Sequence, residues 1–193
     1  MKIIIGISGA SGSIFGVRLL EILREINDVE THLIVSKWGQ QTLEYETELS
    51  ISEVRDLADY SYSQSEMGAA ISSGSFLTDG MIIAPCSMRT VAAIANGISE
   101  NLIHRAADVI IKEKRKLVLL PREAPLSQIH LENLLKLSRI GVVILPPDPA
   151  FYNKPKSIQD IVNHVVLKSC DQFDIKIDIG ERWDGDMGYK NRN

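Results

Sequence analysis

The chain has 193 residues, of which 45% are hydrophobic and 24% are charged, and its net charge is -4. This length and composition are typical of a globular domain with one core. The negative net charge and the lack of a Lys/Arg run argue against a nucleic-acid-binding protein. No apolar run reaches the ~18 residues that a membrane-spanning helix requires. The two cysteines lack metal-type spacing, and the first residues do not resemble a signal peptide. We therefore expect a cytoplasmic protein with reduced thiols and no metal site.

The first stretch of the chain joins a strand pattern to a helix pattern through small residues. Residues 2–7 are an apolar run, and residues 14–26 carry apolar side chains at helical spacing. The loop between them is rich in glycine and serine, so its backbone can approach a ligand at the start of the helix and hold a phosphate there. A tight turn without a ligand is the alternative interpretation. The loop lacks the lysine of a nucleoside-triphosphate loop and the glycine spacing of a dinucleotide fold, which favours a mononucleotide.

Four further apolar runs predict strands buried on both faces, and helical patterns separate them. The strands are expected at residues 31–35, 81–85, 117–121 and 142–146, and the helices at 38–48, 51–57, 90–95, 102–115, 129–137 and after Ser157. Alternating strands and helices predict an α/β fold, a single-domain Rossmann or flavodoxin-like parallel sheet with helices on both faces. We expect this domain to span residues 1–175, followed by a polar tail at 176–193 that only Trp183 can anchor.

Hydroxyl groups and an arginine follow the predicted strands where each strand ends. Ser11, Ser36, Ser87, Thr90 and Arg122 all occupy such positions. In a parallel sheet these positions meet at one edge, where ligands bind. Ser87 and Thr90 also flank a helix start, where capping is an equally good explanation of the two residues. The sequence therefore predicts a ligand site at this edge.

Several charged residues have both a structural and a functional interpretation. Arg122 and Glu123 form either a solvated pair or an anion-binding arginine beside a proton carrier. One helical face carries Arg105, Asp108 and Lys112. The three side chains form either an exposed ladder of ion pairs or, with Arg105 and Lys112 directed at it, a site for a substrate phosphate.

Seven stretches, in order, resemble the flavin prenyltransferase (UbiX-like) family, formerly labelled aromatic-acid decarboxylases. They are residues 6–12 (GISGASG), 36–37 (SK), 85–87 (PCS), 101–108 (NLIHRAAD), 117–123 (LVLLPRE), 129–133 (IHLEN) and 149–152 (PAFY). The resemblance covers residues 1–170. It implies a transferase that joins the dimethylallyl group of dimethylallyl monophosphate to N5 and C6 of reduced FMN. Phosphate is released without a metal, and the prenylated FMN serves a UbiD-like decarboxylase.

The resemblance also implies roles for individual residues. FMN would be held by Gly9, Ala10, Ser11, Ser36, Ser87, Met88, Arg89, Thr90 and Arg122. Tyr152 and Lys168 would bind the donor phosphate, although many relatives carry arginine at the position of Lys168. Glu123 would be the acid–base residue, with Glu46, Ser11, Arg105 and Lys112 in the catalytic set. The family forms dodecamers, and the tail around Trp183 resembles one that covers a neighbouring subunit's site.

Two other functions are weighed against this one. An FMN-dependent decarboxylase of the cysteine-decarboxylase type requires a Pro-x-Met-Asn clamp and a histidine just after the first helix begins, and the sequence has neither. A non-catalytic FMN carrier of a decarboxylase complex would tolerate substitution of Glu123, Lys112 and Tyr152.

Overall fold

The computed structural model describes residues 1–183 and 185. The chain divides into two compact units, Met1–Pro147 and Asp148–Asn193. The boundary after residue 175 that the sequence suggests stays a prediction. Residues 184 and 186–193 of the predicted tail lie outside the described residues.

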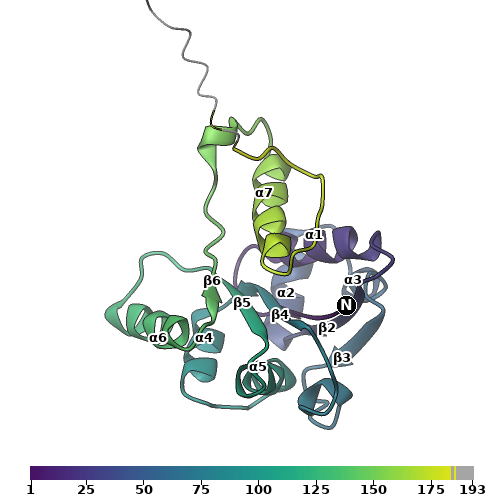
Figure 1. Ribbon diagram of the computed structural model, residues 1–193, viewed down its shortest axis with the longest axis vertical. Coiled ribbons are helices and arrows are strands. Elements are labelled where there is room, and N and C mark those ends of the chain that lie inside the picture. Colours follow the sequence, from purple (N-terminus) through teal and green to yellow (C-terminus); the bar gives the residue numbers. More distant parts are fainter. Residues whose placement is uncertain (184, 186–193) are drawn as a thin grey trace, which may run out of the picture. The chain divides into compact units, whose positions relative to one another are not determined.

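The first unit is built on a parallel sheet (Figure 1). Within the described residues the sheet has six strands: β1 (Lys2–Ile7), β2 (Glu30–Val35), β3 (Tyr60–Ser63), β4 (Gly80–Cys86), β5 (Lys116–Pro121) and β6 (Val143–Ile144). Their spatial order is β3-β2-β1-β4-β5-β6, and every neighbouring pair is parallel. The order reverses between β1 and β4. Ligands of such sheets bind at this switch point, beyond the carboxyl ends of the strands.

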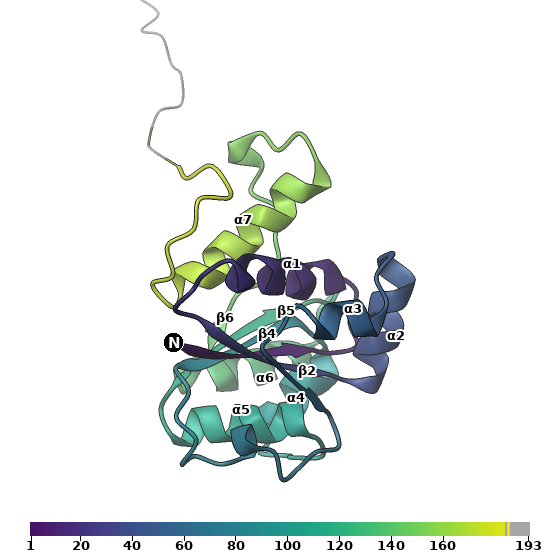
Figure 2. The same ribbon diagram turned by 90° about the vertical axis from the view of Figure 1, so that its right-hand side faces the viewer.

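Helices cover this sheet on both faces, as Figure 2 shows for α1 on one side and α4, α5 and α6 on the other. The helices of the first unit are α1 (Ser13–Arg24), α2 (Lys37–Glu46), α3 (Ile51–Arg55), α4 (Met88–Ala95), α5 (Leu102–Lys112) and α6 (Gln128–Arg139), with a 3-10 turn, η1, at Ala70–Ser72. The side chains of Ile3, Ile4 and Ile5 are at most 1% exposed, because β1 is sandwiched between these layers.

The second unit contains a 3-10 turn, η2 (Phe151–Asn153), and the helix α7 (Ile158–Asp171). The hydroxyl of Ser157 accepts from the backbone N–H of Asp160, and the carboxylate of Asp160 accepts from the backbone N–H of Ser157, so α7 begins with a complete capping box. The chain after α7 is tied back to it by Arg182, whose guanidinium donates to both carboxylate oxygens of Asp171 at 2.7 and 2.9 Å.

The predicted fold class is confirmed. Five predicted strands are present with shifts of a few residues at their ends, β6 being shortened to Val143–Ile144. The sequence analysis missed β3, whose Tyr-Ser-Tyr-Ser sequence is polar and partly exposed. This strand lies at the edge of the sheet and pairs only with β2 in the described chain, so it needs no apolar run.

Candidate functional site

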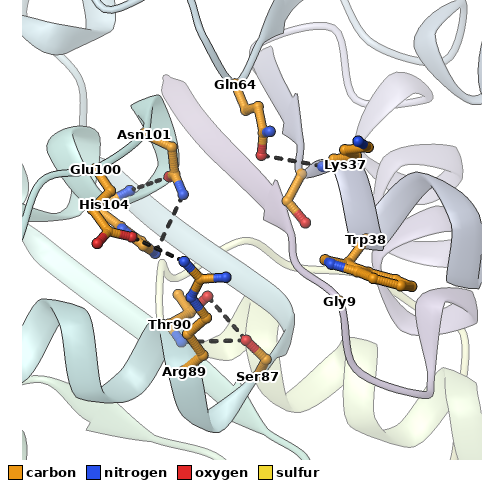
Figure 3. Close-up of a pocket in the computed structure, with 11 residues that line it drawn as sticks. Gly9, Lys37, Trp38, Gln64, Ser87, Arg89, Thr90, Glu100, Asn101 and His104 are labelled. Carbon is orange, nitrogen blue, oxygen red and sulfur yellow. Dashed lines mark hydrogen bonds and ion pairs between the residues drawn. The ribbon is translucent and has the colours of Figure 1, made fainter.

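A cavity of about 390 Å³ opens at the carboxyl ends of β1, β2 and β4 (Figure 3). Its lining comes from separate segments of the first unit: Gly9, Ser36, Lys37, Trp38, Gln64, Ser87, Arg89, Thr90, Glu100, Asn101 and His104. The volume lies within the roughly 300–1,000 Å³ of small-molecule sites, and the position is the switch point of the sheet.

The helices α2, α4 and α5 all begin at this cavity. Their N-cap residues Ser36, Ser87 and Asn101 line it, and each side chain accepts a hydrogen bond from the backbone N–H three residues later, at 2.9, 3.2 and 3.0 Å. The N-terminal ends of helices carry partial positive charge, and Lys37 and Arg89 add two full positive charges, of which that of Arg89 is paired with Glu100 of the same lining at 3.1 Å. These helix ends and cations fit the phosphate of a mononucleotide such as FMN.

Gln64 connects two of these helix ends. The side-chain oxygen of Gln64 accepts from the backbone N–H of Lys37 at 3.1 Å, and the backbone carbonyl oxygen of Gln64 accepts from the backbone N–H of Leu102 at 2.8 Å. Figure 3 shows its amide directed toward Lys37 across the top of the cavity. Gln64 was not a predicted site residue, because it directly follows β3, which was not predicted, and lies in no motif.

Close backbone packing shapes the wall at Gly9. A Cβ atom added to Gly9 would lie 2.4 Å from the Cβ of Trp38, a distance that real side chains do not adopt. Glycine at this position therefore lets the loop after β1 pass against the first turn of α2. Trp38 was not a predicted site residue, although it directly follows the Ser36-Lys37 motif.

The N-terminus of α1 already holds an anionic group of the protein itself. The carboxylate of Glu46, the last residue of α2, accepts from the backbone N–H groups of Gly12 and Ser13 at 2.8 and 3.0 Å. Burial opposes ionisation, but hydrogen bonds from the Ser11 side chain and from these N–H groups outweigh it and lower the pKa of Glu46. The start of α1 thus holds a carboxylate of the protein itself, and phosphate binding by the glycine-rich loop stays a prediction.

His104 is a buried member of the cavity wall, only 3% exposed. Nε2 of His104 lies 3.5 Å from Nδ2 of Asn101, which is a weak contact. Nδ1 of His104 has no hydrogen-bond partner among the described residues. Burial lowers the pKa of His104, with a smaller opposing contribution from Glu100, so the ring is neutral at neutral pH. The sequence offered only its place beside Arg105 as a signal.

The predicted cofactor-binding residues fall into two groups. Gly9, Ser36, Ser87, Arg89 and Thr90 line the cavity. The others are not part of this lining: Ala10 and Ser11 follow Gly9, Met88 is buried in the first turn of α4, and Arg122 follows β5.

Arg122 and Glu123 stand at the same edge of the sheet. The backbone N–H of Arg122 donates to the carbonyl of Cys86 at 3.2 Å, which fixes the end of β5 beside the end of β4. Both side chains are exposed, and Glu123 accepts a hydrogen bond from the N–H of Ala124 at 3.1 Å. An exposed carboxylate next to an arginine is available to a substrate at this edge.

Arg105 and Lys112 extend away from the cavity along α5. Arg105 pairs with Asp108 at 2.8 Å and donates to the carbonyl of Ser72 at 3.1 Å, while Lys112 pairs with Glu113. Because α5 begins at the cavity with Asn101 and rises about 1.5 Å per residue, Lys112 lies about 16 Å further along the helix. The described part of the chain does not bring these two cations to its own cavity, and their catalytic roles stay predictions.

Tyr152 and Lys168 belong to the second unit. Tyr152 is exposed, and its hydroxyl lies 3.5 Å from Nε2 of His164. Lys168, one turn after His164 on α7, is 3.6 Å from a carboxylate oxygen of Asp171. Trp183 packs edge-on against Tyr152 of its own chain, with ring centroids 5.9 Å apart. The predicted cover of a neighbouring subunit's site by the tail stays a prediction.

In the part of the chain that the structure describes, no three histidine, cysteine, aspartate or glutamate side chains gather as metal ligands. Nor do the described residues include a helix long and apolar enough to span a membrane.

Comparison with known proteins places the chain in a family. The family model described as Flavoprotein matches residues 1–169. The flavin prenyltransferase LpdB of Lactiplantibacillus plantarum is 57% identical over 185 residues, which cover 96% of this chain and 99% of that protein.

Two solved structures are similar over nearly the whole chain. One is the dodecameric FMN-dependent UbiX-like decarboxylase from Escherichia coli O157:H7, with a TM-score of 0.95 and 55% identity over 96% of this chain and 100% of that chain. The other is AnUbiX (PadA1) in complex with FMN and dimethylallyl pyrophosphate, with a TM-score of 0.94 and 50% identity over 95% of this chain and 97% of that chain. The resemblance found in the sequence is thus confirmed: this chain belongs to the UbiX-like flavin prenyltransferase family of flavoproteins.

Proposed function

We propose that this chain transfers the dimethylallyl group of dimethylallyl monophosphate to N5 and C6 of reduced FMN and releases inorganic phosphate. The observation that carries the proposal is the cavity at the switch point, where three capped helix N-termini and two cations of the described residues meet. The chain is also 57% identical to a flavin prenyltransferase. FMN, when bound, supplies the nucleophilic ring edge that receives the prenyl group.

In this proposal the first unit holds the flavin. The N-cap hydroxyls of Ser36 and Ser87 and the charge of Arg89 bind the polar end of FMN. Gly9 leaves room at the wall by letting the loop after β1 pack against Trp38. Ala10, Ser11, Met88, Thr90 and Arg122 complete the proposed FMN site.

The residues of the second unit act on the donor. Tyr152 donates a hydrogen bond to the donor phosphate, and Lys168 balances its charge as the C–O bond to the prenyl group breaks. A monophosphate needs fewer cations than a diphosphate, so Lys168 together with the hydroxyl of Tyr152 suits this smaller leaving group.

Proton transfer is assigned to Glu123. Its exposed carboxyl at the edge of the sheet gives a proton to the departing phosphate and takes one from C6 during ring closure, so that protons balance over the cycle. Glu46, which accepts hydrogen bonds from Ser11 and from the start of α1, supports the loop after β1, and Arg105 and Lys112 remain proposed members of the catalytic set.

We further propose that the chain assembles as a homo-oligomer, a dodecamer like the E. coli neighbour, and delivers its product to a UbiD-like decarboxylase of aromatic acids. A cytoplasmic location is supported by the two cysteines, Cys86 and Cys170, which are free and buried in the described chain.

The test is an anaerobic reaction of the protein with reduced FMN and dimethylallyl monophosphate, with dimethylallyl diphosphate in a parallel reaction. We expect phosphate release and an extracted flavin heavier by one prenyl unit, and a faster reaction with the monophosphate. Tightly bound but unmodified flavin with both donors would overturn the transferase and leave a non-catalytic FMN carrier.

A further inference from the structure

A small hydrogen-bond network surrounds Tyr152 in the second unit. The side-chain nitrogen of Asn153 lies 3.0 Å from the carbonyl oxygen of Glu181 and 3.1 Å from Nδ1 of His164. The other ring nitrogen of His164, Nε2, lies 3.5 Å from the hydroxyl of Tyr152. These contacts join η2, α7 and the segment after α7.

The chemistry of these atoms fixes the direction of each hydrogen bond. A backbone carbonyl can only accept, so the Asn153 atom that faces Glu181 is the NH₂ group, with two hydrogens to donate. Its second hydrogen is given to Nδ1 of His164, which must therefore be unprotonated. In a neutral imidazole the proton then sits on Nε2, facing Tyr152.

We propose that His164, oriented by Asn153, is a positioning residue that donates to the Tyr152 oxygen and so leaves the Tyr152 hydrogen free for the donor phosphate. This inference rests on the proposed function, which assigns the phosphate to Tyr152 and Lys168. The Nε2–oxygen distance of 3.5 Å is at the long end of hydrogen-bonding distances, and catalytic contacts of this kind tighten in the substrate complex.

Packing holds the Tyr152 ring in the orientation that the network needs. His164 and Trp183 each meet it edge-on, at centroid distances of 5.9 Å. Trp183 is held in turn by its neighbour Arg182, which forms the two-pronged ion pair with Asp171. These two contacts define the orientation of the ring, and Tyr152 is 54% exposed, so a ligand can reach it.

The charges around His164 favour its neutral form. Burial, followed by the positive charge of Lys168, lowers the pKa of His164; Arg182 acts in the same direction and Asp171 opposes them. At neutral pH the ring thus has a single proton, as the assigned hydrogen bonds require.

The first experiment compares two substitutions of His164. Phenylalanine keeps an aromatic ring against Tyr152 but has no donor, whereas glutamine keeps an N–H near the position of Nε2 without the ring. We expect His164→Phe to raise both the KM and the dissociation constant for dimethylallyl monophosphate about tenfold and to leave FMN affinity unchanged. We expect His164→Gln to retain most of the wild-type affinity for the donor. Equal donor binding by wild type and His164→Phe would overturn the inference.

The second experiment reads the tautomer directly. The ¹⁵N spectrum of histidine-labelled protein should show His164 with its proton on Nε2; the His164→Phe spectrum identifies the signal among the four histidines. In Asn153→Asp the carboxylate can only accept, so we expect the proton to move to Nδ1 and donor affinity to fall as in His164→Phe. A wild-type proton on Nδ1 would overturn the inference.

Failure of the proposed function would look different. A wild-type protein that makes no prenylated flavin refutes the transferase. Titration with dimethylallyl monophosphate and with inorganic phosphate still tests whether His164 orients Tyr152 toward a phosphate. The inference fails if neither binding constant changes in His164→Phe.

Discussion

Ser8 joins the ends of β1 and β4 at the switch point by accepting a hydrogen bond from the backbone N–H of Ser87 at 2.8 Å. The same buried hydroxyl donates to the carbonyl of Pro85 at 3.0 Å. Ser87 in turn caps α4, so one buried side chain sets the position of a helix end that lines the cavity.

Replacing Ser8 by alanine should therefore loosen the cavity as well as the fold. The substitution leaves the N–H of Ser87 without its acceptor, which costs about 1–3 kcal/mol, and we expect weaker FMN binding. Denaturant unfolding and FMN titration measure the two effects. Ser169→Ala is the control, since that buried hydroxyl donates only to a carbonyl of its own helix, that of Val165. Equal losses in the two variants would contradict the bridging role.

Gly9→Ala tests the cavity wall. The new Cβ would lie 2.4 Å from the Cβ of Trp38, so the first turn of α2 must move, and we expect at least tenfold weaker FMN binding, about 1.4 kcal/mol. Gly68→Ala is a matched control, because a Cβ there meets no atom within 4 Å. FMN titration by fluorescence compares them; wild-type affinity in Gly9→Ala would rule out this wall as part of the flavin site.

Glu46→Gln tests the carboxylate at the start of α1. Hydrogen bonds to a charged group contribute about 1.5–3 kcal/mol, and because Glu46 is exposed we expect a loss of only about 1 kcal/mol at pH 7. Hydrogen bonds outweigh burial and lower the pKa of Glu46 in the folded protein. Its contribution to the free energy of unfolding is therefore complete above the ordinary glutamate pKa and is lost as the pH falls through the lowered pKa of the folded protein.

The unfolding free energies of wild type and Glu46→Gln should thus converge in acid. Glu48→Gln, an exposed carboxylate two residues later, should match wild type throughout. A constant difference between wild type and Glu46→Gln from pH 7 to pH 3 would refute the ionised cap.

Glu123→Gln tests proton transfer. Loss of a general acid–base group slows reactions by roughly 10²–10⁴, so we expect phosphate release to fall at least a hundredfold while FMN binding is retained. Single-turnover assays under anaerobic conditions measure the step. Glu132→Gln on α6, whose carboxylate only accepts from Gln128, is the surface control. Full turnover by Glu123→Gln would remove the residue from the mechanism.

Lys168→Ala tests the donor phosphate site. Loss of a charge-assisted contact of about 1.5–3 kcal/mol predicts a 10- to 100-fold weaker affinity for dimethylallyl monophosphate, with a much smaller effect on FMN. Lys168→Arg should retain donor binding, since the guanidinium also pairs with phosphate. Lys176→Ala, an exposed lysine of the same unit, should bind the donor normally. An unchanged donor affinity in Lys168→Ala would assign the lysine to its ion pair with Asp171 alone.

The elements of this fold were largely readable from local sequence. The apolar run of β1 and the Ser157 cap with the apolar spacing of α7 depend on residues close together in the chain, and both are present. β3 was not predicted, because Tyr60–Ser63 is stabilised as an edge strand by its neighbour β2 rather than by its own composition.

The sequence by itself thus determined the parallel α/β class, the strand-end residues and the family motifs, since apolar periodicity, caps and motifs are local properties. Tertiary structure alone decided how these pieces meet. Gln64 joins α2 to α5, and Glu46, which the sequence connects to the site only through the family resemblance, occupies the start of α1 from 34 residues away. Such pairs depend on the strand order, which sets β1 between β2 and β4 and so brings distant backbone donors within hydrogen-bonding distance of these side chains.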